Sequence, residues 1–252
     1  MYEILTSRNV GLLSRKEQES LWELRVGIAG CGMGSVISEC ITRLGVGKLI
    51  IADPDNVEIS NLNRQNFYMW EVGRNKALTV KQHLRMINPA IDVIAWPEAI
   101  TPQNIPEFVR HCDIIVDGID PIPGIRISRQ LAQECSNVGK PFLYPIDIGW
   151  GALSLNFGFN EIKFEDVVKD GSNTELLNNL VRFIQSNIDL PLYVIEIWEK
   201  FQRNELSNWP QPITATLTAS ILVTTIIVKI IKREPVPFLI YLDPFLNTFI
   251  VK

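Results

Sequence analysis

The chain has 252 residues, of which 46% are hydrophobic and 21% charged, with a formal net charge of −4. This length suffices for one large α/β domain, and the composition excludes fibrous, low-complexity and disordered classes. The acidic balance argues against a nucleic-acid partner. Four cysteines without a CxxC pair and a start without signal-peptide layout indicate a cytoplasmic protein with reduced thiols: Cys31, Cys40, Cys112 and Cys135.

Strands and helices alternate through the first 150 residues. Ser14 and Glu17 form a capping box, which predicts a helix over 14–22. Alternation at this spacing predicts βαβ units, and therefore a doubly wound, largely parallel, Rossmann-like sheet with right-handed crossovers. The predicted segments are strands at 25–30, 48–53, 91–96, 113–120 and 141–146, and helices at 35–45, 74–89, 104–112 and 123–139.

The pattern changes after Gly149. A further strand is predicted at 151–159, and the polar, mostly helical sequence that follows indicates an insertion. The apolar run 212–228 is shorter than the roughly 20 residues of a membrane span, so we predict a buried helix over 213–232 and no membrane contact. Two strands then form a C-terminal antiparallel extension. The chain is thus predicted as a single domain with four parts: an N-terminal helical arm (1–24), a nucleotide-binding core (25–159), a variable helical insertion (160–210) and a C-terminal helix with strands (211–252).

Gly30, Gly32 and Gly34 lie between the first predicted strand and the next helix. Such a turn lets backbone N–H groups and the helix dipole hold a phosphate. Asp53, at the end of the second strand, is placed to hydrogen-bond ribose hydroxyls. These residues indicate a ribose-containing nucleotide, so NAD, FAD, S-adenosylmethionine and ATP stay open. A tight turn without a ligand is the structural alternative.

Arg64 and Lys76 follow the second strand, beside the crevice where α/β sheets bind ligands. A nicotinamide site needs an apolar floor at this position, which two cations do not provide. Two cations are instead suited to neutralise a nucleoside triphosphate. Asp117 and Asp120 end the fourth strand at the same edge, where a carboxylate beside a triphosphate is most simply a magnesium ligand. For each of the four residues, a solvated loop charge is the alternative.

The chain resembles the ThiF/MoeB and ubiquitin-activating-enzyme superfamily of adenylyltransferases in five stretches: "GCGMGS", "LGVGKLIIADPDNVEISNLNRQ", "GRNKALTVKQHLRMINP", "DIIVDGID" and "YLDPF". The resemblance covers about residues 5–160 and 210–252. It implies an enzyme that uses ATP and Mg²⁺. A carboxylate attacks the α-phosphate, which gives an acyl-adenylate and pyrophosphate.

The resemblance also implies roles for individual residues. Asp53, with Asp55 in the same D-x-D motif, would bind the nucleotide at its ribose. Asp120 would bind magnesium and orient the attacking carboxylate. Arg8, in "SRNVGLL", would act as an arginine finger that reaches into the partner subunit's site of a homodimer. The phosphates would be held by four side chains: Asn61, Arg64, Gln65 and Lys76.

Three departures from the family pattern change what is expected. The glycine turn is one residue shorter than the usual GxGxxG, which affects contacts near the α-phosphate. The two CxxC pairs that bind structural zinc in many members are missing, so we expect no zinc. No cysteine follows Cys135, so we expect neither a thioester nor a persulfide on the enzyme.

The expected substrate is the C-terminal carboxylate of a small protein or peptide, or a peptide side chain. Similarity to the tRNA threonylcarbamoyladenosine dehydratase branch favours a tailoring enzyme, although the acidic balance argues against a tRNA substrate. An NAD- or FAD-binding Rossmann oxidoreductase and a catalytically silent partner subunit are the alternatives.

Two further groups of residues have expected positions. Six aromatic residues of the insertion would form either a docking surface for the partner or packing in the core or at the dimer contact: Phe164, Phe183, Tyr193, Trp198, Phe201 and Trp209. His83, on the exposed side of its helix, and His111, at a helix end, are not expected to be catalytic.

Overall fold

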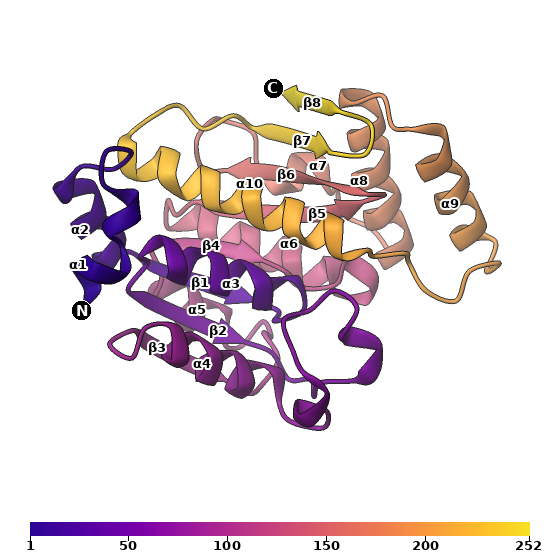
Figure 1. The fold of residues 1–252 in the computed structure, drawn as a ribbon. Helices are drawn as coiled ribbons and strands as arrows, with labels where there is room; N and C mark the ends of the chain where they lie inside the picture. Colours follow the sequence, from indigo (N-terminus) through magenta and orange to yellow (C-terminus); the bar gives the residue numbers. More distant parts are fainter.

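The computed structural model, which describes residues 1–252, contains one eight-stranded sheet (Figure 1). The strand order is β3-β2-β1-β4-β5-β6-β7-β8, with the first five strands parallel and the last three antiparallel. The predicted fold class is therefore confirmed. The strands are β1 (Arg25–Ala29), β2 (Lys48–Ala52), β3 (Asp92–Trp96), β4 (Ile114–Asp117), β5 (Phe142–Ile148), β6 (Gly151–Phe157), β7 (Leu239–Asp243) and β8 (Thr248–Val251).

Helices cover both faces of the sheet (Figure 1). One apolar cluster joins the sheet to α3, α4 and α10, and a second joins it to α5, α6, α7 and α8. The helices are α1 (Tyr2–Leu5), α2 (Arg15–Glu23), α3 (Met33–Leu44), α4 (Lys76–Ile87), α5 (Ile105–Arg110), α6 (Pro121–Asn137), α7 (Phe164–Val167), α8 (Asn173–Asn187), α9 (Leu192–Gln202) and α10 (Ile213–Lys232).

The first strand in the chain, β1, lies at the centre of the parallel part of the sheet. It pairs with β2 on one side and with β4 on the other, because the chain winds first to one edge and then to the other. At the carboxyl ends, Gly30 N donates to Ala52 O (2.8 Å) and Gly118 N donates to Ala29 O (2.7 Å). Ligands of doubly wound sheets bind at such a reversal of strand order, so this edge is where a site is expected.

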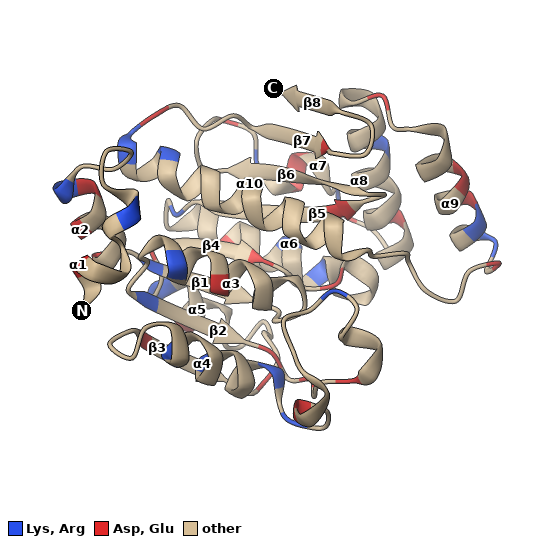
Figure 2. Cartoon of the chain, viewed as in Figure 1, with Lys and Arg blue, Asp and Glu red and all other residues tan.

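Helix α10 lies across β5 and β6 and beside α3. Its inner face is buried through residues such as Ala219, Val223 and Ile226, as a core helix requires. By length and composition it is apolar enough to cross a membrane, and it carries no charge before Lys229 (Figure 2). The packing agrees with the predicted core helix. Its outer face exposes Ile213 and Leu217.

The expected exposure of His83 is wrong. This side chain is 6% exposed, and its Nε2 lies 2.6 Å from Glu71 Oε1. The segment before α4 folds back over the helix and places Phe67, Tyr68 and Glu71 against the imidazole. Periodicity within α4 does not reveal this cover, because the covering segment has no regular pattern. His111 is exposed at the C-terminal end of α5, as predicted.

Candidate functional site

A cavity of about 630 Å³ opens at the carboxyl ends of the parallel strands. One half is polar and lies beside the glycine turn, and the other half is apolar and lies against α8 and α9. Nine of the twelve site residues named from the sequence line it: Gly30, Gly32, Asp53, Asp55, Asn61, Arg64, Gln65, Lys76 and Asp120. Arg8, Gly34 and Asp117 do not.

The three glycines of the turn have different roles. Gly30 has φ +87°, and a Cβ there would lie 2.5 Å from Gly118 O, so no other residue fits without displacing the neighbouring loop. Gly32 is the N-cap of α3 and offers no side chain between the cavity and the helix N-terminus. Gly34 is buried, and a Cβ there would lie 2.6 Å from Ile28 Cγ2. Gly34 therefore allows α3 to approach β1 and does not face a ligand.

Asp53 is held beside the turn by backbone donors. Its Oδ2 accepts from Cys31 N (2.6 Å) and its Oδ1 accepts from Asp55 N (2.8 Å). Burial raises the pKa of Asp53, and these N–H groups and Lys76 oppose the shift. Since each carboxylate oxygen can accept a second hydrogen bond, the side chain can also bind ribose hydroxyls from the cavity.

Two cations lie in the polar half. Lys76 is the first residue of α4 and only 7% exposed, and its Nζ lies 3.1 Å from Asp55 Oδ2. Arg64 is half-buried and makes no salt bridge; its Nη1 donates to Ser60 O (3.1 Å) and Asn63 Oδ1 (2.9 Å). Because no carboxylate pairs with this guanidinium, it is available to form an ion pair with an anionic ligand.

Two amides from the same segment complete this wall. Asn61 is buried, and its Oδ1 accepts from Glu58 N (3.0 Å), which fixes its orientation. Gln65 lies against Gly32, and its buried Oε1 has no hydrogen-bond partner. Both residues line the cavity, and the hydrogen bond to Glu58 N fixes the amide of Asn61.

Asp120 and Asp117 are separated by the structure. Asp120 caps α6 through Ile122 N (2.9 Å) and lines the cavity. Burial raises the pKa of Asp120, and the charges of Arg64 and Lys76 oppose this shift. The two cations therefore interact electrostatically with Asp120. Asp117 is fully buried, and its Oδ1 accepts from Ile119 N (2.9 Å). It does not line the cavity, so the hypothesis that it binds magnesium there is wrong.

Arg8 lies outside this cavity. It is exposed in the 3₁₀ turn Ser7–Asn9 and makes no salt bridge. The arm that carries it, with α1 and α2, lies at the end of the sheet away from the strands' carboxyl ends (Figure 1). Arg8 therefore cannot complete the site of its own chain in this arrangement.

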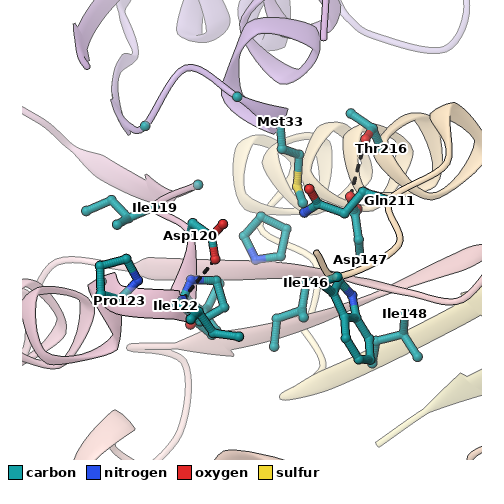
Figure 3. Close-up of a pocket in the computed structure, with 18 of the residues that line it drawn as sticks. Met33, Ile119, Asp120, Ile122, Pro123, Ile146, Asp147, Ile148, Gln211 and Thr216 are labelled. Atoms are coloured by element: carbon teal, nitrogen blue, oxygen red, sulfur yellow. Dashed lines mark hydrogen bonds between the residues drawn. The ribbon is translucent and has the colours of Figure 1, made fainter. Parts of the chain in front are cut away.

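Sequence reasoning missed Asp147. This residue is in β5 and is 5% exposed at the cavity wall, with its Oδ2 accepting from Thr216 Oγ1 at 3.3 Å (Figure 3). Its Oδ1 is buried without a partner, and burial raises the pKa of Asp147 to about 7. A single acid inside the apolar stretch "FLYPIDI" is the signal that could have identified it.

The apolar half of the cavity is also built largely from residues that the motifs do not include. Its lining contains Leu180, Ile184, Val194, Trp198 and Trp209, from α8, α9 and the loop that follows. The aromatic residues of the insertion have mixed roles. Phe164 is in the core and Phe183 and Tyr193 pack against it, whereas Trp198, Phe201 and Trp209 cluster with ring centroids 6.0–6.3 Å apart.

The four cysteines are free, and none lines the cavity. Cys31 is buried in the glycine turn, and burial raises the pKa of Cys112 to about 12. No group of three or more His, Cys, Asp or Glu side chains is arranged to hold a metal ion.

Comparison with known proteins gives consistent matches. The profile of the ThiF family matches residues 6–157. The sulfur carrier protein adenylyltransferase of Thermus thermophilus is 35% identical over 130 residues, which are 50% of this chain and 46% of that protein. The sulfur carrier protein ThiS adenylyltransferase of Bacillus subtilis is 38% identical over 142 residues, 55% and 41% of the two chains. The chain thus spans about half the length of these relatives.

Solved structures share the fold at low sequence identity. PaaA has a TM-score of 0.70 and 18% identity, covering 100% of this chain and 69% of that one. E. coli MccB has a TM-score of 0.69 and 21% identity, covering 94% and 63%. A further structure holds MccB with AMPCPP and MccA, with a TM-score of 0.67 and 20% identity over 94% of this chain and 65% of that one.

Proposed function

This chain belongs to the ThiF family, and from that premise we propose that it is an ATP-dependent adenylyltransferase. It activates a carboxylate as an acyl-adenylate and releases pyrophosphate. The observation that carries this proposal is the convergence of Arg64, Lys76 and Asp120 on the glycine turn in one cavity. An anion-binding turn with two cations and one carboxylate suits a triphosphate and its counter-ion.

The reaction needs positioning and charge neutralisation. An oxygen of the ionised carboxylate forms a bond to the α-phosphorus, and the bond to the bridging oxygen breaks, so that pyrophosphate leaves with the electron pair. No proton has to move, because the nucleophile is already an anion. Arg64 and Lys76 would neutralise the charge that develops on the phosphates, while Asp53 would hold the ribose.

Asp120 would provide the protein ligand for magnesium. A Mg²⁺ ion in a nucleotide site keeps several waters and the substrate phosphates, and needs only one or two carboxylates. The carboxylate of Asp120, in the same cavity as Arg64 and Lys76, fits this requirement without a dedicated cluster of protein ligands. The metal would supply further neutralisation of the triphosphate.

The proposed acyl substrate is a carboxylate of a peptide or small protein. The apolar half of the cavity offers space for side chains next to the nucleotide half. The adenylate would pass directly to its acceptor, because the cysteines are outside the cavity and burial raises their thiol pKa values, Cys31 and Cys135 included.

We also propose a homodimer in which Arg8 completes the partner's site. Helix α10 reaches the cavity with Thr216 near its first turn and contacts α2 of the N-terminal arm. Its exposed stripe includes Ile213, Leu217 and Ile221. Antiparallel packing of two such helices about a twofold axis would bring the arm of one subunit to the cavity of the other, about 30 Å along the helix.

Calorimetric titration with MgATP and with NAD tests the proposed activity. We expect MgATP to bind the wild type and its affinity to fall at least about 100-fold in Lys76→Ala, because a buried cation is lost. Lys81→Ala, which removes a lysine of the same helix outside the cavity, is the control. Binding of NAD instead, or equal MgATP affinity in all three proteins, would contradict the proposal.

A further inference from the structure

Asp147 is a buried acid in the cavity wall that the proposed adenylation mechanism does not use. Its carboxyl group lies across the cavity from Asp120, beside Thr216 and Gln211 at the start of α10 (Figure 3). The residues before and after it, Ile146 and Ile148, also line the cavity. Asp147 is therefore an acidic group in the wall between the nucleotide half and the apolar half.

The hydrogen bonding of Asp147 is incomplete. Thr216 donates to Oδ2, while Oδ1 is buried and has no partner. No lysine, arginine or histidine of this chain forms a salt bridge with it. A desolvated carboxylate without a counter-ion is costly, and that cost is offset when a cation binds beside it.

We propose that Asp147 is a specificity-determining residue that binds an ammonium group of the acyl substrate. This inference rests on the proposed adenylation, and it names the substrate class: an amino acid or peptide that carries a primary ammonium on an apolar body. The ammonium would donate to the carboxylate of Asp147, and the apolar body would lie against side chains such as Ile184, Val194 and Trp198.

The residues that line the cavity around Asp147 indicate which cation binds it. The charge of Arg64 lowers the pKa of Asp147 without forming a salt bridge with it. In the proposed reaction Arg64 and Lys76 would be engaged by the nucleotide phosphates and would not pair with Asp147. The neighbouring lining groups on the α10 side, Gln211 and Thr216, are uncharged. A ligand ammonium is therefore the group that supplies the missing charge, and Asp147 selects for it against neutral acids of the same shape.

Small probes test this subsite without knowledge of the natural substrate. 4-Phenylbutylamine and 4-phenylbutanol share an apolar body and differ in the ammonium group. Each is titrated by calorimetry into the wild type, Asp147→Asn and Asp92→Asn, the last removing an exposed acid on the edge strand β3. MgATP is titrated into the same three proteins, and thermal unfolding checks that each is folded.

We expect the amine to bind the wild type and Asp92→Asn at least tenfold more tightly than the alcohol. In Asp147→Asn the ratio should fall to about one, with MgATP affinity unchanged. An amine that binds no better than the alcohol to the wild type, or a preference that survives in Asp147→Asn, would overturn the inference. If MgATP binds none of the three proteins, the proposed adenylation is refuted. The inference about Asp147 is tested separately, because the amine-to-alcohol ratio is measured without MgATP.

Discussion

Because the carboxyl group of Asp117 is buried, we predict that the free energy of unfolding depends strongly on pH. Asp117 is 1% exposed, and burial raises its pKa from the usual 3.8 to about 7. Below about pH 4 the group is protonated in both the folded and the unfolded chain. Between pH 4 and 7 the folded chain binds more protons than the unfolded chain, so stability falls as pH rises through this window.

The size of the effect follows from the shift. About three pKa units at 1.36 kcal/mol per unit correspond to ~4 kcal/mol of destabilisation above pH 7, as an upper limit. Asp117→Asn keeps the oxygen that accepts from Ile119 N but cannot ionise. We therefore expect Asp117→Asn to gain up to ~4 kcal/mol relative to the wild type between pH 4 and pH 8.

Urea unfolding at pH 4, 6 and 8 measures this difference. Any pH-independent cost of the amide cancels, because only the change in the gap between the two proteins is used. Asp92→Asn, at an exposed position, is the control. The quantity compared is the free energy of unfolding of Asp117→Asn minus that of the wild type. If this difference stays constant or falls as pH rises, Asp117 is not a destabilising buried acid.

Two further predictions concern the glycine turn and the subunit contact. Gly30 and Gly73 have φ +87° and +88°, but only a Cβ at Gly30 meets another atom, Gly118 O at 2.5 Å. In urea unfolding, Gly73→Ala should cost ~1 kcal/mol and Gly30→Ala at least ~2 kcal/mol more; equal losses would argue against the steric role. Leu217→Lys, in the exposed stripe of α10, should raise the dimer dissociation constant at least about 100-fold in light scattering. A dimer of unchanged stability would exclude this helix as the contact.

Much of the polar half could be predicted because its chemistry is local in sequence. A glycine turn, an acid at a strand end and cations on the next segment each follow a parallel strand, and parallel strands meet at one edge. The role of Gly34 could not be read in this way. Whether a glycine faces a ligand or a neighbouring strand depends on how far α3 is rotated, and here it faces Ile28.

The rest of the cavity depends on contacts between distant parts of the chain. Asp147 and Thr216 are 69 positions apart and meet only because α10 lies across β5. Leu180 and Trp198 belong to amphipathic helices whose apolar faces look the same in sequence whether they cover a core or line a cavity. His83 was misplaced for a related reason, since its partner Glu71 lies in a short 3₁₀ turn before α4 that the periodicity of α4 does not reveal.

The boundary of the family match passes through the cavity. The nucleotide half is built from residues inside 6–157, whereas Leu180, Trp198, Gln211 and Thr216 on the other half come after it. Under the proposed adenylation, replacement of the later segments would change which acid is activated and would leave the nucleotide half unchanged. Such a division would let one inherited reaction be redirected to new substrates by exchanging one wall of the cavity, and α8 and α9 would be the place to begin a redesign.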